Sequence, residues 1–427
     1  MSGKFDVLIV GAGPAGVTTA ICLGNSGLKV AVIDKACFPR EKICGDGLTL
    51  DVINQLFLIS PRLYAAFMDF NSKLPCSGAE IFSPSLDRFS LGVRPDSEKK
   101  PMFTCRRIDF DDFMFGELKQ YENVCTFENC IPLKIIHAGD SIILDTNQGR
   151  FEGSILVGAD GVNSFVAREM GVKHITKEQQ CVALRTYYRG LKPLSEGSAI
   201  EMYLAKEILP GYLWIFHLAD GSSNVGLGMP AKVIKRKGIK LKKCFEGLLM
   251  SEPLKSRLAG AERTDAVRGR IIPMGGQKRD ISGNRFILTG DAASLVDPIT
   301  GEGVGNAIRS GRVAGKHIIR CFKSADFSGA ANKAYDAEIY RRMKNEFRFH
   351  LSLQKLLYYP GLLNYILGSA ANYPEVELSL KQLIWNLHSG AIFSRILLVF
   401  RLIYLFTFQR LFASRNRPKK GFSQQVS

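Results

Sequence analysis

The stretch Phe5-Asp6-Val7-Leu8-Ile9-Val10-Gly11-Ala12-Gly13-Pro14-Ala15-Gly16 decides the fold of this 427-residue chain. Its first six residues are a short β-rich run of the kind that is buried in a parallel sheet. An apolar helix is expected over 17–23, and a second strand over 28–33 that ends at Asp34. Strand, glycines, helix, strand and an acid about twenty residues after the glycines together make a dinucleotide-binding βαβ unit. The sequence therefore predicts an α/β fold with a Rossmann-type domain at its start.

The spacing of these glycines has a chemical reason. The first permits a tight turn, the second lets the backbone approach a pyrophosphate, and the third allows close helix–strand packing. The helix N-terminus offers unpaired N–H groups to the anion, and the acid can accept hydrogen bonds from ribose hydroxyls. The motif alone does not separate FAD from NAD. The candidate cofactor-binding residues of this unit are Gly11, Gly13, Pro14, Ala15, Gly16, Asp34 and Lys35.

Three later segments add to this unit. The loop 38–48 carries basic residues and glycines that suit contact with a phosphate or a flavin, although it could also be a solvated loop. The run 155–164 reads as a strand that enters a Gly-Asp-Gly turn at Asp160. The run 286–307 reads as a strand, then Asp291, then a glycine-rich loop that opens a helix. Each aspartate could bind a sugar hydroxyl, or could serve only as a turn residue or helix N-cap.

In this order the segments resemble the flavoprotein superfamily of p-hydroxybenzoate hydroxylase, and more closely its geranylgeranyl reductase branch, over roughly residues 4–325. The resemblance implies that FAD is the cofactor and that the βαβ unit holds its ADP half. It also implies that Asp291 binds the ribityl chain and that the helix start after the glycine-rich loop faces the isoalloxazine ring. The further cofactor-binding candidates are Arg40, Cys44, Gly45, Arg107, Asp160, Gly290, Asp291, Gly301, Gly303, Val304, Gly305 and Asn306.

No second complete glycine motif with a βαβ context occurs, and the superfamily likewise lacks a separate nicotinamide domain. We therefore expect NAD(P)H or another electron donor to visit the flavin transiently. In the reductase branch the residue that matches Cys44 lies beside the reactive edge of the flavin. Cys44 is thus the candidate catalytic residue, and a buried inert thiol is the alternative.

The middle of the chain changes to alternating, aromatic-rich strands, which predict an antiparallel sheet that forms a substrate domain. Residues 210–216 resemble a signature of the reductase branch that lines a lipid cavity, so Tyr212, Trp214 and His217 are the candidate substrate-pocket residues. His217 stands where the signature has a proline, and Asp46 interrupts what is often a run of glycines. Core packing of the two aromatic residues and a structural role for the histidine are the alternatives. The expected strands are 181–188, 199–204, 211–218 and 224–229.

The predicted domain organisation is discontinuous. Residues 1–70, 101–175 and 277–332 are expected to form the FAD-binding domain, and residues 71–100 and 176–276 the substrate domain. Residues 333–427 are expected to form a C-terminal helical region, with helices over 333–350, around 351–357 and over 376–387.

The formal net charge of +17 needs an explanation, and nucleic acid and an anionic membrane surface are the two possibilities. No helix-turn-helix, zinc-finger or aromatic RNA-binding pattern supports nucleic acid. Residues 391–427 contain no acid and join a bulky apolar stretch to a basic flank. That stretch is too interrupted for the roughly 20 apolar residues of a spanning helix, but it fits a helix in the interface of an anionic membrane. A helix packed on the protein's own core is the alternative.

Cysteine usage and the start of the chain bear on location. Ten cysteines without disulfide or metal-ligand spacing predict reduced thiols, and no zinc site is expected. No secretory signal is recognised at the start, so we expect a cytoplasmic protein, peripheral on a membrane if the C-terminal stretch binds one.

Two reactions suit such a flavoprotein. The favoured one is reduction of carbon–carbon double bonds in a prenyl or other long-chain lipid. The alternative is hydroxylation of an aromatic or lipid-tailed aromatic substrate by a monooxygenase, and a flavin-binding protein without catalysis is the minor third. The chain lacks the WxWxIP signature of flavin halogenases, which disfavours halogenation.

Overall fold

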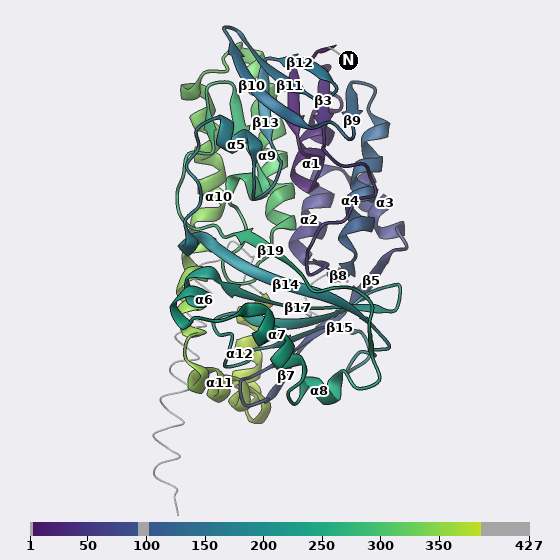
Figure 1. Cartoon of the computed structure of the whole chain (residues 1–427), viewed down its shortest axis with the longest axis vertical. Helices are drawn as coiled ribbons and strands as arrows, with labels where there is room; N and C mark the ends of the chain where they lie inside the picture. Colours follow the sequence, from purple (N-terminus) through teal and green to yellow (C-terminus); the bar gives the residue numbers. More distant parts are fainter. Residues whose placement is uncertain (1–2, 93–101, 386–427) are drawn as a thin grey trace, which may run out of the picture.

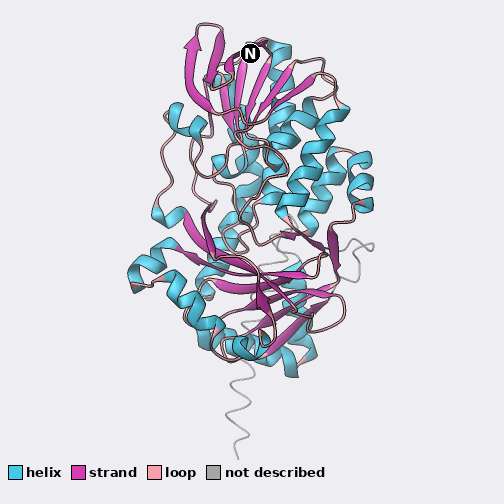
Figure 2. Ribbon diagram, turned by 45° about the vertical axis from the view of Figure 1, so that its right-hand side comes forward, coloured by secondary structure: helices cyan, strands magenta, loops and turns pink. Residues whose placement is uncertain are grey.

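The computed structural model describes residues 3–92 and 102–385. The described chain has an upper half built on a parallel sheet and a lower half built on a large, mainly antiparallel sheet (Figure 1). Helices cover the upper sheet, and further helices lie along the lower one (Figure 2).

The upper sheet contains the glycine motif. Its neighbouring strands are parallel except at one edge, where β20 runs antiparallel to β21. The strand of the motif lies in the middle, which is where open α/β sheets bind ligands. The order is β20 (Ser282–Gly283), β21 (Phe286–Leu288), β13 (Ile155–Gly158), β2 (Val7–Val10), β3 (Val30–Ile33) and β9 (Val124–Phe127).

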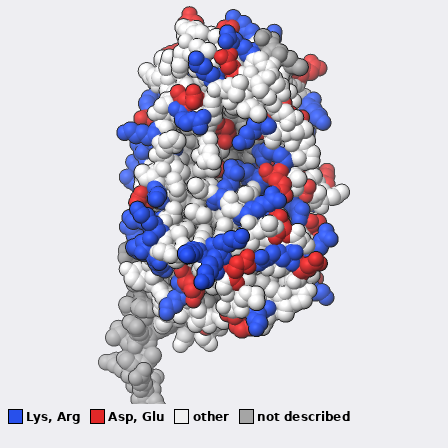
Figure 3. Space-filling view, in the orientation of Figure 1, with Lys and Arg blue, Asp and Glu red and all other residues white. Residues whose placement is uncertain are grey.

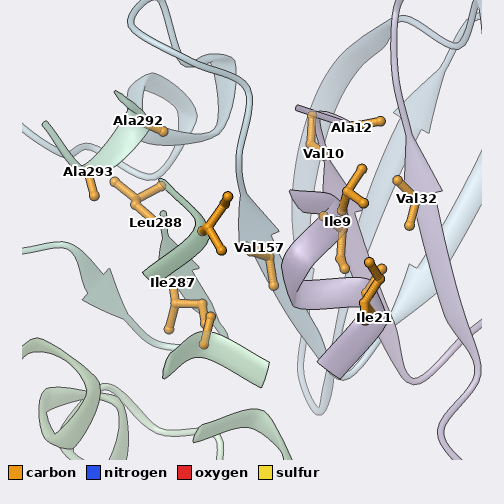
Figure 4. Close-up of a cluster of buried hydrophobic side chains, with 14 of the residues drawn as sticks. Ile9, Val10, Ala12, Ile21, Val32, Val157, Ile287, Leu288, Ala292 and Ala293 are labelled. Carbon is orange, nitrogen blue, oxygen red and sulfur yellow. The ribbon is translucent and has the colours of Figure 1, made fainter. Parts of the chain in front are cut away.

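These strands are short and apolar, and both of their faces are buried. All residues of β2, β3, β13 and β21 are buried. Figure 4 shows Ile9, Val157 and Ile287 from three neighbouring strands within one apolar cluster. The helices of this half are α1 (Pro14–Leu23), α2 (Leu50–Ile59), α3 (Pro61–Asp69), α4 (Arg107–Gly116), α5 (Phe165–Glu169), α9 (Val304–Ser324) and the start of α10 (Gly329–Leu356).

Two small sheets accompany the upper half. One has four strands in the order β1 (Gly3–Lys4), β12 (Gly149–Gly153), β11 (Ser141–Thr146) and β10 (Pro132–Ala138). The other has three strands in the order β4 (Gly47–Leu48), β8 (Met102–Cys105) and β5 (Lys73–Cys76).

The lower sheet confirms the expected strands to within two residues at each end. One expectation was wrong, because β6 and β15 pair in parallel rather than antiparallel. Parallel neighbours need a long crossover, and here much of the upper half lies between them in the sequence. The order is β18 (Glu262–Arg263), β14 (Gln180–Arg189), β17 (Ser222–Pro230), β16 (Tyr212–His217), β15 (Ser198–Tyr203), β6 (Gly78–Phe82) and β7 (Arg88–Gly92), with β19 (Arg268–Pro273) also paired to β14.

Two groups of helices pack on this sheet. The first group is α6 (Ala231–Lys237), α7 (Leu241–Leu249) and α8 (Leu254–Arg257), whose apolar side chains share a cluster with Leu213 and Ile215. The second is α11 (Pro360–Asn372) and α12 (Pro374–Trp385), which share a different cluster with Ala79 and Leu204.

The C-terminal region joins the two halves. The helix expected over 333–350 and the stretch after it form one continuous helix, α10. Its first part contacts β20 and β21, and Leu351 near its end borders the cavity described below. The predicted domain boundaries stay a prediction. Three parts of the predicted organisation lie outside the described residues. They are residues 93–100 of the substrate-domain segment 71–100, the end of the helix expected over 376–387, and the whole stretch 391–427.

Candidate active site

The residues singled out by sequence gather at one edge of the upper sheet. Strands β2, β3, β13 and β21 all point the same way, and each is followed at its carboxyl end by a candidate residue. Gly11 follows β2, Asp34 follows β3, Asp160 comes shortly after β13 and Asp291 shortly after β21. Parallel strand order thus brings four distant segments to the edge where such sheets bind nucleotides.

The first turn leaves no room for side chains. Gly11 has φ +102°, and a Cβ there would lie 2.4 Å from the Ala159 carbonyl oxygen. A Cβ on Gly16 would lie 1.9 Å from the Gly11 carbonyl oxygen. The backbone is therefore bare at the helix start, as a pyrophosphate requires.

Asp34 holds this turn in place. Its Oδ2 accepts from the Ala12 N–H at 2.7 Å, and its Oδ1 accepts from the Ala36 N–H at 2.9 Å. Each carboxylate oxygen keeps a second lone pair that can accept from a ribose hydroxyl. The acid therefore has a structural role in addition to the one inferred from the motif.

A single large cavity of about 1340 Å³ runs from this edge to the lower sheet. It is larger than the roughly 300–1,000 Å³ of an ordinary ligand pocket, so it has room for a dinucleotide and a second molecule. The starts of α1 and α9 both line it. The sequence-predicted residues on its wall are Gly13, Pro14, Ala15, Cys44, Gly45, Arg107, Asp291, Gly301, Gly303, Val304, Tyr212 and Trp214.

The remaining candidates do not line the cavity. Asp160 accepts from Ser164 Oγ and from the Val166 N–H, so it supports the start of α5, while its neighbours Ala159 and Gly161 line the cavity. Burial raises the pKa of Asp160. The others off the wall are Gly11, Gly16, Asp34, Lys35, Arg40, Gly290, Gly305, Asn306 and His217.

Basic side chains surround the middle of the cavity. Arg107 is buried and donates to both oxygens of Asp111, at 2.8 and 2.9 Å. Arg40 pairs with the same carboxylate at 3.1 Å. Lys42 Nζ lies 3.4 Å from Asp291 Oδ2, and burial, with help from Arg107 and Arg270, lowers its pKa.

Lys42 and Arg270 line the cavity but were not among the sequence-predicted residues. Lys42 lies two residues after Arg40 in the loop 38–48, whose basic residues the sequence analysis had noted. That position could have identified Lys42 as a candidate cavity residue. Arg270 comes from β19, and only the pairing of β19 with β14 brings it to this place.

The loop at Cys44 is fastened from below by Asp46. This carboxylate is fully buried and accepts from Tyr187 OH at 2.7 Å, Asn224 Nδ2 at 2.7 Å and the Arg107 N–H at 3.1 Å. Burial raises the pKa of Asp46 in spite of these donors. Asn224 Nδ2 also donates to the Cys44 carbonyl at 2.8 Å.

The same asparagine reaches the aromatic wall, because its Oδ1 accepts from Trp214 Nε1 at 2.9 Å. The Cys44 thiol itself lies against Arg107: burial lowers the pKa of this guanidinium, but Asp111 and Cys44 outweigh it and the net shift is upward. A polar network thus links the candidate catalytic cysteine to the tryptophan that borders the cavity.

The strand β16 presents one face to the cavity. Tyr212, Trp214 and Phe216 alternate along it and all three line the cavity. The assignment of His217 to the pocket was wrong, because side chains two apart share a face and 217 is out of step with 212 and 214. His217 is buried behind the strand, where it bonds Glu201 at 3.0 Å and Ser223 at 2.9 Å.

Beyond Trp214 the cavity continues as an apolar arm. Sequence analysis did not foresee this part, since its walls come from strands and helices that are far apart in the chain. We define the apolar arm by the side chains of Ala79, Ile81, Leu91, Ile200, Met202, Leu204, Leu351, Leu353, Leu356, Leu357, Leu362, Leu363, Ile366, Leu367, Leu380, Leu383 and Ile384.

One group of possible metal ligands borders the glycine-rich loop. Asp297, Glu346 and His350 carry ligand atoms within 4.8 Å of one another. Asp297 Oδ1 already accepts from the Ile299 N–H at 3.0 Å and the Thr300 N–H at 2.9 Å, and its other oxygen bonds His350. These bonds explain the cluster as a clamp between the loop and α10.

Comparison with known proteins gives matches over most of the chain. A family model described as an FAD binding domain matches residues 4–49. Digeranylgeranylglycerophospholipid reductase of Methanocella arvoryzae is 28% identical over 79% of this chain and 83% of its own length. Menaquinone reductase of Mycolicibacterium smegmatis is 26% identical over 74% of this chain and 76% of its own length.

Among solved structures, a geranylgeranyl bacteriochlorophyll reductase-like protein of Thermoplasma acidophilum superposes with a TM-score of 0.75 at 22% identity. The match covers 90% of this chain and 100% of that one, so it includes the glycine-motif sheet, the lower sheet and much of the C-terminal region.

Proposed function

Because the chain belongs to the geranylgeranyl reductase family of the p-hydroxybenzoate hydroxylase-like FAD-dependent oxidoreductases, we propose that it reduces carbon–carbon double bonds in the prenyl part of a long-chain lipid. The observation that carries the proposal is the apolar arm, which leads straight from the Cys44 loop and Trp214. A hydrocarbon chain gains about 0.8 kcal/mol for each methylene that such walls remove from water.

The residues present fit FAD. Bare backbone at Gly13 and a helix N-terminus at Ala15 suit its pyrophosphate, and Asp34 suits the adenosine ribose. Asp291 lines the cavity where the ribityl chain would lie, and the start of α9 at Gly303 and Val304 suits the electron-rich edge of the ring. When bound and reduced, FAD supplies the hydride; NAD(P)H or another donor would reduce it.

The protein itself would position a proton donor beside the reacting carbons and keep water away from them. Saturating one double bond adds a hydride to one carbon and a proton to the other, so an acidic group must stand near the reacting carbons. Cys44 is the candidate, since its thiol lies in the cavity wall against Arg107. Trp214 and Phe216 lie against the adjoining Gly45 and add apolar surface there, which would exclude water from the reacting carbons.

The charge and the substrate class together support a place at a membrane. No helix in the described part of the chain is both long and apolar enough to span a bilayer. A peripheral position fits a lipid substrate that must be taken from the bilayer, with the basic, acid-free stretch 391–427 as one contact.

The test is anaerobic incubation of the photoreduced holoenzyme with a mixture of isoprenoid alcohols and quinones. We expect mass spectrometry to find products heavier by two hydrogens and the flavin to reoxidise in step with them. An absolute need for oxygen and a product heavier by one oxygen atom would replace this proposal by the monooxygenase. Asp145→Asn serves as the control variant. It changes a β11 side chain that pairs with Arg150 far from the cavity, so it should give the same products as the parent.

A further inference from the structure

A basic segment crosses the lower half outside the cavity. Between Asp220 and Glu246 the chain has no acidic residue. Within this interval, α6, the residues that link it to α7 and the start of α7 carry seven cationic side chains within the twelve residues 232–243. They are Lys232, Lys235, Arg236, Lys237, Lys240, Lys242 and Lys243, and we call them the basic face.

These side chains are free to meet a partner. All seven residues are exposed, and none of them takes part in an ion pair within the part of the chain that the structure describes. The opposite side of these helices packs on the protein itself, since Val233, Phe245 and Leu249 are buried against the lower sheet. Figure 3 shows Lys and Arg side chains gathered over the region where Figure 1 places α6.

The basic face adjoins the far end of the apolar arm. The Arg236 guanidinium lies 5.8 Å from the ring centre of Tyr358, in the corner between α10 and α11. Tyr358 is 39% exposed and Tyr359 62%, whereas the preceding Leu356 and Leu357 line the arm. Cations, interfacial tyrosines and an apolar channel therefore lie next to one another on one side of the molecule.

We propose that the basic face and the Tyr358–Tyr359 corner dock on an anionic lipid bilayer, with the apolar arm directed at it. Each cation near an anionic surface adds attraction within a Debye length, and tyrosine prefers the boundary between headgroups and acyl chains. Docking by this side would bring the part of the arm at Leu356 and Leu357 near the acyl chains. The proposal rests on the proposed function for its purpose, but on charge and geometry for its evidence.

A bilayer fits these observations better than nucleic acid. A nucleic-acid groove would combine cations with groups that read or stack bases. Here the nearest aromatic side chains border an apolar channel instead. Lipids match both features, because their phosphate groups suit the cations and their acyl chains suit the apolar channel.

The experiment is sedimentation of the FAD-loaded full chain with vesicles. One set of vesicles contains equal parts of phosphatidylglycerol and phosphatidylcholine, and the other phosphatidylcholine alone. We expect binding to the first set only, weakened by salt. The variant K232E/K235E/R236E/K237E should bind several hundredfold more weakly, since each of the four cations contributes on the order of a factor of five. The matched control K29E/K119E/K134E/K173E reverses the same number of exposed charges on the upper half and should bind as the parent does.

Two further arms complete the test. The variant R410E/R415E/R417E/K419E changes the C-terminal stretch, and the dependence on the basic face must persist in it. Reduction of geranylgeraniol dispersed in detergent should be unchanged by the basic-face variant, which shows that it is folded and separates docking from catalysis. Equal binding of parent and basic-face variant would overturn the docking proposal, as would loss of vesicle binding on adding a short DNA duplex. Failure to reduce any prenyl compound would overturn only the proposed function.

Discussion

At the scale of single residues, Asp46 explains the departure of this chain from the glycine run of the reductases that it resembles. The residue has φ +68°, a conformation that favours glycine, so an aspartate there is under backbone strain. Its side chain offsets the strain by accepting three hydrogen bonds in a site with no solvent exposure. Through Asn224 those bonds fix both the Cys44 carbonyl and the Trp214 indole.

We therefore expect Asp46→Gly to relieve the strain yet destabilise the protein, because Tyr187 and Asn224 lose their acceptor. The expected loss is about 1–3 kcal/mol in the free energy of unfolding by urea, the usual cost of unpaired buried polar groups. The turnover number should fall while FAD content is retained, since Asp46 acts on the Cys44 loop and the Arg107 backbone and not on the glycine motif or Asp34. Asp140→Gly, at a fully exposed turn, is the control and should change neither quantity. A variant as stable and active as the parent would show that the network does not position the loop.

Residue types were predictable where a motif or a period fixed them. The glycines and aspartates could be found because strand order brings each one to the same edge of the sheet. His217 was misplaced although the needed signal was present, since period-2 alternation already put it on the face opposite Trp214. Arg270 could not be found from the sequence, because only the pairing of β19 with β14 brings it to the cavity, whereas Lys42 lies in a loop whose basic residues were already noted.

At the scale of elements, β15 and β16 are joined by a buried ionic network on the side away from the cavity. Glu201 has no solvent exposure and is bonded by His217 at 3.0 Å, Arg257 at 2.6 Å and Tyr203 at 2.8 Å. Burial works to raise the pKa of Glu201, but these donors outweigh it and the net pKa is lowered. The network fixes the strand whose other face carries Trp214.

We expect Glu201→Gln to cost about 3–5 kcal/mol at pH 7, because the largely buried Arg257 guanidinium would lose its carboxylate. The folded pKa lies below the unfolded value of 4.5, so the stabilisation is complete above pH 4.5 and is lost as the pH falls further. Urea unfolding of parent and variant should therefore differ widely at pH 7, and the difference should shrink as the pH falls below 4.5. Glu152→Gln removes an exposed partner of Lys4 and should change stability by less than about 1 kcal/mol. If the difference in free energy of unfolding between parent and Glu201→Gln grew as the pH fell, the lowered pKa of Glu201 would be contradicted.

Helices and strands with a clear period were predicted closely, as β14 to β17 show. Their pairing was less predictable. Nothing in residues 78–82 indicated a parallel partner at 198–203, because that choice is made by the path of the chain through the upper sheet.

At the scale of the whole molecule, the two halves meet along the cavity. The upper half supplies the residues suited to FAD, the lower sheet supplies the aromatic wall, and α10 to α12 close the apolar arm. The sequence indicated both halves and the cofactor, but it read the C-terminal helices as a separate region. Their role depends on packing between surfaces hundreds of residues apart, which no local pattern records.

If the arm holds the hydrocarbon tail, its length should set chain-length preference. Leu367 on α11 is almost fully buried and lines the arm, so Leu367→Trp should block part of it. Excluding three or four methylenes removes about 2–3 kcal/mol of burial, which is a rise of roughly 30- to 150-fold in KM for a twenty-carbon prenyl alcohol. A ten-carbon alcohol would not reach the block, so its KM and kcat should stay near those of the parent. Leu378→Trp places the same ring on α12 at a residue that is 49% exposed and off the cavity wall, and should alter neither substrate. Equal losses for both chain lengths would mean that the larger side chain disturbs packing generally, and that the tail lies elsewhere.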